Sequence, residues 1–280
     1  MTMSNSITPP IGTEPFRISS VLFKSGSVYL DRFFIFFVVA LSYLLPEVLM
    51  QFAFGVWPMQ ITHKPAAVPD FRGFWAHLIS LPLTIIGTSM LIVLSFQKLD
   101  GQASHVGAAF RQALSRFFSV LGIFLLTGVF IMIGAVLGMV VAVAVHLALS
   151  HFFPVVGDFP LAGVSFTIGF ALSVALVILV ACMFCVATPA SLGERLGPWT
   201  SIQRSRELSR GERWRIFGLS AIVFLPISLL GFAAPFGVAR GLSSVAVSLA
   251  LFGVSLISTP FITAVYTVLF RNLRIAKEGV

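Results

Sequence analysis

Charged residues are scarce in this sequence. Lys, Arg, Asp and Glu make up only 10% of its 280 residues, against about 25% in a typical soluble domain. Hydrophobic residues make up 58%, and the mean hydropathy is +1.01. Too few charged side chains are present to cover a surface in water, so most of the surface must face lipid. The composition therefore excludes an ordinary soluble enzyme and indicates an integral membrane protein.

Cysteine is nearly absent, which excludes a disulfide framework for an extracellular domain. The two cysteines, Cys182 and Cys185, have C-x-x-C spacing and lie in an apolar run. This spacing indicates redox chemistry only where water reaches the thiols. We therefore interpret both cysteines as small packing residues within a membrane span.

The sequence also lacks the motifs of several enzyme classes. No G-x-S-x-G, H-E-x-x-H, Walker or G-x-G-x-x-G pattern occurs in a suitable context. Four histidines fall on the predicted outer side of the membrane, but no pair has the spacing of a metal site. These histidines are His63, His77, His146 and His151. We expect a protein that is not an enzyme and that binds no cofactor and no metal ion.

Long apolar runs dominate the rest of the chain. About 20 apolar residues cross the ~30 Å hydrocarbon core as a helix, and the runs lack the two-residue alternation of membrane strands. We therefore predict an all-α membrane protein with six transmembrane helices. The predicted spans are residues 33–54, 78–96, 118–146, 164–187, 216–236 and 242–270.

The basic residues are distributed unevenly between the two sides of these spans. Fifteen of the 18 Lys and Arg residues fall in the N-terminal segment, in the loops after spans two and four, or at the C-terminus. Only Lys64, Arg72 and Arg240 fall on the other side. Cytoplasmic loops carry the excess of Lys and Arg, so both termini are predicted to be cytoplasmic.

The N-terminus lacks a basic region followed by a short apolar core. We therefore expect no removable signal peptide, and the first span would serve as an uncleaved signal. Residues 1–16 are predicted to be a disordered cytoplasmic segment. Residues 17–280 are predicted to form a single six-span membrane domain.

Amphipathic segments precede the first, third and fifth spans, over residues 18–32, 104–117 and 198–213. Apolar stripes beside basic residues predict interfacial helices on the cytoplasmic face. Each segment leads into its span through a basic and aromatic sequence, as at Arg116-Phe117. Two interpretations stay open: a threefold repeat of helical hairpins, or the ordinary belt of Arg and aromatic residues at membrane surfaces.

The densest polar feature precedes the fifth span. It comprises Arg204, Arg206, Arg210, Arg213 and Arg215, with Glu207 and Glu212 between them and Trp199 and Trp214 nearby. Anionic lipid attracts a basic side chain at the membrane surface by about 1 kcal/mol. We predict that this cluster contacts anionic lipid, and a membrane-protein partner is the alternative because Arg and Trp are favoured in interfaces. The basic excess does not indicate nucleic acid.

Glu47 is the acidic residue placed deepest in a predicted span, where it follows Pro46. An acid at membrane depth is costly and marks a proton or substrate pathway. The same residue would be unremarkable in the outer headgroup layer. Glu47 is the candidate residue for a proton or substrate pathway, and a location in the headgroup layer is the alternative.

Several stretches resemble bacterial membrane proteins related to the membrane domain of glycerophosphoryl diester phosphodiesterases. The resemblance lies in Ala187-Thr188-Pro189-Ala190, Glu194 to Pro198, Arg204 to Leu208, Arg213-Trp214 and the ending from Tyr266 to Gly279. It covers about residues 187–220 and 260–280, and stand-alone relatives are six-span inner-membrane proteins. The resemblance implies a bacterial inner-membrane module, and it carries no catalytic residues across.

These observations predict a non-enzymatic multi-pass protein of the bacterial inner membrane that organises lipid or an associated membrane complex. The alternative is a small transporter or lipid-translocating protein. That alternative rests on Glu47, on the glycine-rich third span and on Pro82, Pro226 and Pro260, which permit bending.

Overall fold

The computed structural model describes residues 17–54, 71–152 and 158–279, which form ten α-helices and no strand. Six helices in these residues are long and apolar enough to cross a membrane. The predicted all-helical fold with six spans is confirmed. The chain therefore has the helices of a multi-pass membrane protein.

The spanning helices follow the predicted apolar runs and extend past most of them. They are α2 (Phe33–Ala53), α3 (Arg72–Leu99), α5 (Phe117–Phe152), α6 (Asp158–Phe184), α9 (Arg213–Ala239) and α10 (Ser244–Glu278). Adding a residue to an existing helix is far easier than starting one, so helices continue into the polar flanks. Pro46, Pro82 and Pro260 lie inside α2, α3 and α10 and do not end them.

The fourth predicted span differs from the observed helix. We predicted that it runs to residue 187, but α6 ends at Phe184 and a separate short helix, α7 (Ala187–Gly193), follows after a turn. Pro189 lies in the first turn of α7, where a backbone N–H would have no partner within the helix. The proline that could not continue α6 is therefore accommodated by a new helix start.

Short helices precede the first, third and fifth spans, as the amphipathic segments predict. They are α1 (Ile18–Asp31), α4 (Val106–Ser115) and α8 (Pro198–Ser209). Pro198 occupies the first position of α8, where its fixed φ favours a helix start. The location of these helices at the membrane surface stays a prediction.

The chain divides into two compact units. One contains α1–α4, α10 and the part of α9 from Ala221 onward, and the other contains residues 115–220. The single domain expected over residues 17–280 stays a prediction, and residues 1–16 lie outside the described residues.

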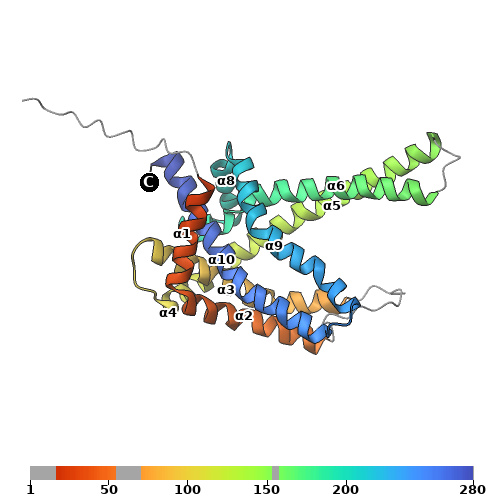
Figure 1. Cartoon of the computed structure of the whole chain (residues 1–280). Helices are drawn as coiled ribbons and strands as arrows, with labels where there is room; N and C mark the ends of the chain where they lie inside the picture. Colours follow the sequence, from red (N-terminus) through yellow and green to blue (C-terminus); the bar gives the residue numbers. More distant parts are fainter. Residues whose placement is uncertain (1–16, 55–70, 153–157, 280) are drawn as a thin grey trace, which may run out of the picture. The chain divides into compact units, whose positions relative to one another are not determined.

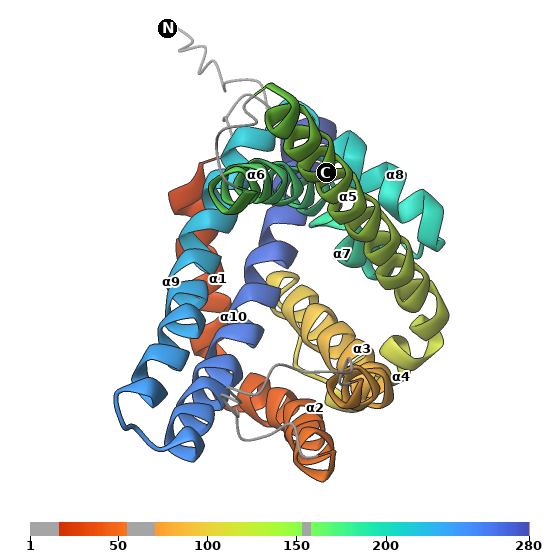
Figure 2. The same ribbon diagram turned by 90° about the vertical axis from the view of Figure 1, so that its right-hand side faces the viewer.

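In the first unit, α10 packs against α1, α2 and α3, and α2 packs against α3 (Figures 1 and 2). The ring of Tyr43 on α2 is only 2% exposed and lies against Gly87 on α3. A Cβ atom added at Gly87 would lie 2.7 Å from Cε1 of Tyr43 and closer still to other ring atoms. This close approach of α2 and α3 therefore depends on a glycine.

In the second unit, α5 and α6 form a long helical hairpin (Figure 1). Gly134 and Gly138 lie four residues apart on α5, and Gly138 faces Gly169 and Ser173 on α6. A Cβ atom at Gly138 would lie 2.6 Å from the carbonyl oxygen of Gly169 and would overlap Oγ of Ser173. Small residues at four-residue spacing let membrane helices approach closely. Gly134 and Gly138 of the third span thus serve close packing with α6.

Two arginines occupy matching positions in the two units. Arg32 lies between α1 and α2 and donates hydrogen bonds to the carbonyl oxygens of Leu94, at 3.4 Å, and of Gln102. Arg116 lies between α4 and α5 and donates to the carbonyl oxygen of Arg195 at 3.1 Å. Gln102 follows α3, the second helix of its hairpin, and Arg195 follows α6 and α7, which come after α5 in the other hairpin. The two arginines therefore make similar contacts, and the threefold repeat stays a prediction.

Candidate functional site

The candidate site is built on α8, which is held firmly within the second unit. Ile202 on its buried face packs with Ile123 and Ala187. The hydroxyl of Ser205 donates a hydrogen bond to the carbonyl oxygen of Met183, near the end of α6, at 2.8 Å. These contacts leave the opposite face of α8 to its charged residues.

Hydrogen bonds from side chains at the start of α5 hold the loop between α7 and α8 in place. Ser119 donates a hydrogen bond to the carbonyl oxygen of Leu196 at 2.9 Å, next to the bond from Arg116 to Arg195. Glu194, at the start of this loop, binds Arg204 on α8 through two hydrogen bonds of 2.9 and 3.1 Å. A bidentate pair of this kind combines strength with a fixed geometry. Arg204 is therefore engaged within the protein.

A tight turn joins α8 to α9. Gly211 adopts a φ of +92°, a conformation that glycine accepts without a steric penalty. The N–H of Glu212 donates to the carbonyl oxygen of Ser209 at 3.2 Å, and the carboxylate of Glu212 pairs with Arg215 at 3.0 Å. The turn thus brings the end of α8 and the start of α9 to one place.

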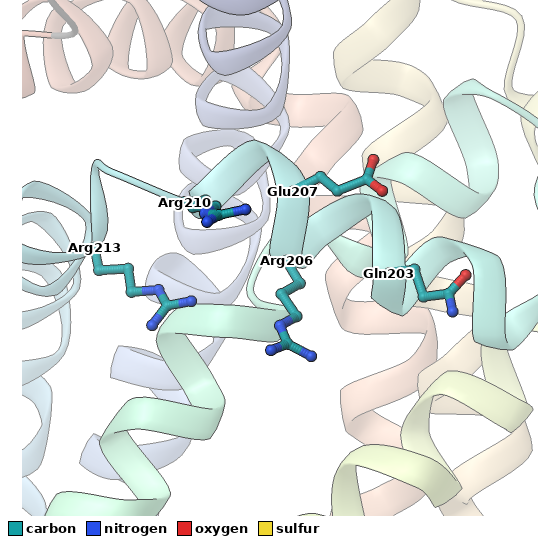
Figure 3. A pocket seen from close by; sticks show the side chains of 5 residues that line it. All are labelled: Gln203, Arg206, Glu207, Arg210 and Arg213. Carbon is teal, nitrogen blue, oxygen red and sulfur yellow. The ribbon is translucent and has the colours of Figure 1, made fainter.

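At this turn lies a hollow of about 570 Å³, which we call the α8–α9 hollow. Its lining residues are all polar: Gln203, Arg206, Glu207, Arg210 and Arg213 (Figure 3). In the view of Figure 3, Arg206 and Arg213 extend downward, whereas Glu207 extends upward. Three guanidinium groups against one carboxylate make the hollow electropositive.

Arg206 and Arg213 differ from the other arginines of the cluster. Arg204 and Arg215 are ion-paired with Glu194 and Glu212. Within the part of the chain that the structure describes, no carboxylate forms an ion pair with Arg206 or Arg213. Their guanidinium groups therefore keep their donors available to a ligand.

The structure distributes the predicted site residues over three environments. Arg206, Arg210 and Arg213 line the hollow, and Arg204 and Arg215 are held by carboxylates. Trp199 and Trp214 are exposed, Trp214 to 85%, and neither lines the hollow. Sequence reasoning missed Gln203 and the role of Glu194. Glu194 lies ten residues from Arg204, across a helix boundary, so no local spacing could have paired them.

Glu47 lies in a separate place, toward the end of α2. Its Oε1 atom is 3.1 Å from Nδ1 of His77 on α3 and 3.4 Å from Nε2 of Gln51. The Glu47 side chain is 20% exposed and that of His77 is 62% exposed. The acid thus has a partner that links the end of α2 to the beginning of α3.

The remaining polar candidates are scattered. Among the described residues, no three His, Cys, Asp or Glu side chains lie close enough to hold a metal ion together. His63 lies outside the described residues. Cys182 and Cys185 carry free thiols at the end of α6, and the thiol of Cys185 contacts the carbonyl oxygen of Cys182 at 3.4 Å.

No known protein family, curated protein or solved structure matches this chain.

Proposed function

We propose that this chain is a non-enzymatic multi-pass protein of the bacterial inner membrane that organises anionic lipid at its cytoplasmic face. The α8–α9 hollow and the basic residues around it are the lipid-contacting surface. One observation carries the proposal: Arg206 and Arg213 have no ion-pair partner among the described residues, and Arg206 projects from a helix that buried contacts fix in place.

The energetics favour lipid as the partner of this surface. Each basic side chain near an anionic membrane contributes about 1 kcal/mol of attraction. The exposed rings of Trp199 and Trp214 suit the headgroup layer, where one part of the ring meets apolar chains and another meets water. Because Ser205 and Arg204 already hold α8 in place, little conformational freedom is lost on binding.

Two other functions were predicted as alternatives. An associated membrane complex would use the same surface, with an acidic protein face replacing the lipid. A small transporter or lipid-translocating protein would use Glu47, which lies 3.1 Å from His77, and among the described residues no third His, Cys, Asp or Glu side chain forms a cluster with them. We therefore favour lipid organisation.

Replacing Arg206 and Arg213 with glutamine should weaken binding of anionic lipid. Removing two basic groups of about 1 kcal/mol each predicts a loss of about 2 kcal/mol, or roughly 30-fold in affinity. The measurement is the binding of vesicles that contain phosphatidylglycerol to the purified full chain at low salt. Exposed charges are screened within ~8–10 Å at moderate salt, so the difference should shrink as salt is added.

The matched control is R72Q/R240Q. Arg72 and Arg240 are exposed arginines that the sequence places on the opposite side of the membrane, and their replacement makes the same change in net charge. We expect this variant to bind anionic vesicles much more tightly than R206Q/R213Q. Equal losses in the two variants would show that the α8–α9 hollow has no special part in lipid binding.

A further inference from the structure

We infer that the α8–α9 hollow binds the phosphate group of one phosphatidylglycerol molecule, held between the guanidinium groups of Arg206 and Arg213. The inference rests on the proposed function, which places anionic lipid at this surface, and goes beyond it. A general basic surface attracts many lipids without fixed stoichiometry, whereas the hollow would hold a single headgroup in a defined position.

The size and lining of the hollow fit a small charged group. Its volume of about 570 Å³ lies in the range of about 300–1,000 Å³ found for small-molecule sites. Such sites are mostly apolar, but all five residues that line this one are polar or charged. The hollow therefore suits a lipid headgroup and does not suit an acyl chain.

Arginine is well matched to phosphate. The guanidinium group is planar and presents its N–H donors as a fork that binds two phosphate oxygens at once. Arg206 comes from α8 and Arg213 from the first position of α9, so two different helices supply the two guanidinium forks that line the hollow. Their donors are not used by any carboxylate of the described residues.

The start of α9 adds a second attraction for an anion. The first N–H groups of a helix have no acceptor within the helix, and the helix dipole places partial positive charge there. No acidic residue occupies the first turn of α9, and the preceding Glu212 is paired with Arg215. A phosphate beside Arg213 would therefore meet positive charge from the backbone as well as from side chains.

Glu207 limits the class of headgroup. It is the only carboxylate among the lining residues, lies 3.9 Å from the guanidinium group of Arg204, and extends away from Arg206 and Arg213 (Figure 3). Its negative charge disfavours multiply charged headgroups, while the three nearby arginines disfavour an ammonium group. A singly charged phosphodiester with hydroxyl groups satisfies both conditions, because Gln203 can donate or accept hydrogen bonds with those hydroxyl groups. Phosphatidylglycerol is the phospholipid of this description.

The flanking residue Trp214 is consistent with a site at headgroup depth. Its ring is 85% exposed and packs edge-on against Phe217, with ring centroids 6.2 Å apart. Tryptophan is enriched where hydrocarbon meets headgroups. The hollow lies where α9 begins, so a bound phosphate would sit at the start of the fifth span.

The test is the variant R206K/R213K, which keeps both positive charges and removes both guanidinium forks. Phosphatidylglycerol retained by the purified full chain is counted by native mass spectrometry at low salt and again after washing at about 1 M salt, where the screening length is about 3 Å. We expect the wild-type chain to keep one lipid per chain after the wash. The variant should bind anionic lipid at low salt but lose it at least tenfold more readily in the wash.

The control R17K/R111K should retain its lipid as the wild-type chain does. If R206K/R213K keeps one lipid through the wash, the discrete site is refuted while the proposed function stands. If the wild-type chain binds no anionic lipid even at low salt, the proposed function itself fails. Displacement of the lipid by inorganic phosphate at millimolar concentration would assign the site to free phosphate and overturn the lipid assignment. Should the double variant not fold, R213K alone carries the same expectation.

Discussion

Replacing Gly138 with leucine is expected to disrupt the hairpin of α5 and α6. The new side chain would have to occupy space held by the carbonyl oxygen of Gly169 and by Ser173. A backbone carbonyl cannot rotate away as a flexible side chain can, so the two helices must separate. Overpacking of this kind costs about 1–3 kcal/mol and occasionally more, and we expect about 3 kcal/mol here. Thermal unfolding of the purified protein in detergent, followed by helical circular dichroism, measures the loss.

Gly128 provides the matched control on the same helix. A Cβ atom added there would meet nothing within 4 Å, so G128L should leave the unfolding temperature close to that of the wild-type chain. Because glycine is intrinsically unfavourable inside a helix, a small increase in the unfolding temperature of G128L would also agree with this expectation. A loss in G128L as large as that in G138L would contradict the close contact between α5 and α6.

Replacing Gly87 with alanine is expected to destabilise the first unit by about 2 kcal/mol, within the range for overpacked cores. The added methyl group would overlap the buried ring of Tyr43. Replacing Tyr43 with leucine removes the ring, so the double variant Y43L/G87A should lose less stability than the two single losses predict. A double-mutant cycle measures this coupling directly.

Gly253 on α10 serves as the control for this prediction, because a Cβ atom there meets nothing within 4 Å. G253A should be neutral or slightly stabilising, since alanine favours helices more than glycine does. Two results would contradict the close approach of α2 and α3. One is additive losses of stability for the variants at Tyr43 and Gly87, and the other is a loss of stability in G253A equal to that in G87A.

Much of the fold could be predicted from the sequence because the membrane imposes strong patterns. Six apolar runs predicted six spanning helices, and the amphipathic segment from residue 198 located the start of α8. The turn after α6 and the start of α7 were missed, since the apolar stretch continues past Phe184 to Ala187 without a polar residue. The sequence also could not predict which residues Gly138 faces, because these depend on how α5 and α6 align.

The candidate site was predictable in composition and not in detail. A dense arginine cluster is conspicuous in a sequence with so few charges. Which arginines are available could not be predicted, since Arg204 finds Glu194 across the α7–α8 loop. The hollow itself depends on the left-handed conformation of Gly211, which sets the path of the chain from α8 to α9.

The most direct measurement is the side of the membrane on which the α8–α9 hollow lies. Reporters that are active only in the cytoplasm or only in the periplasm can be fused after His105, Asp158, Gly211 and Val280. The distribution of Lys and Arg and the positive-inside rule predict cytoplasmic, periplasmic, cytoplasmic and cytoplasmic locations in that order. Periplasmic activity of the fusion after Gly211 would place the basic hollow on the wrong face and contradict both the six-span topology and its contact with cytoplasmic-leaflet lipid.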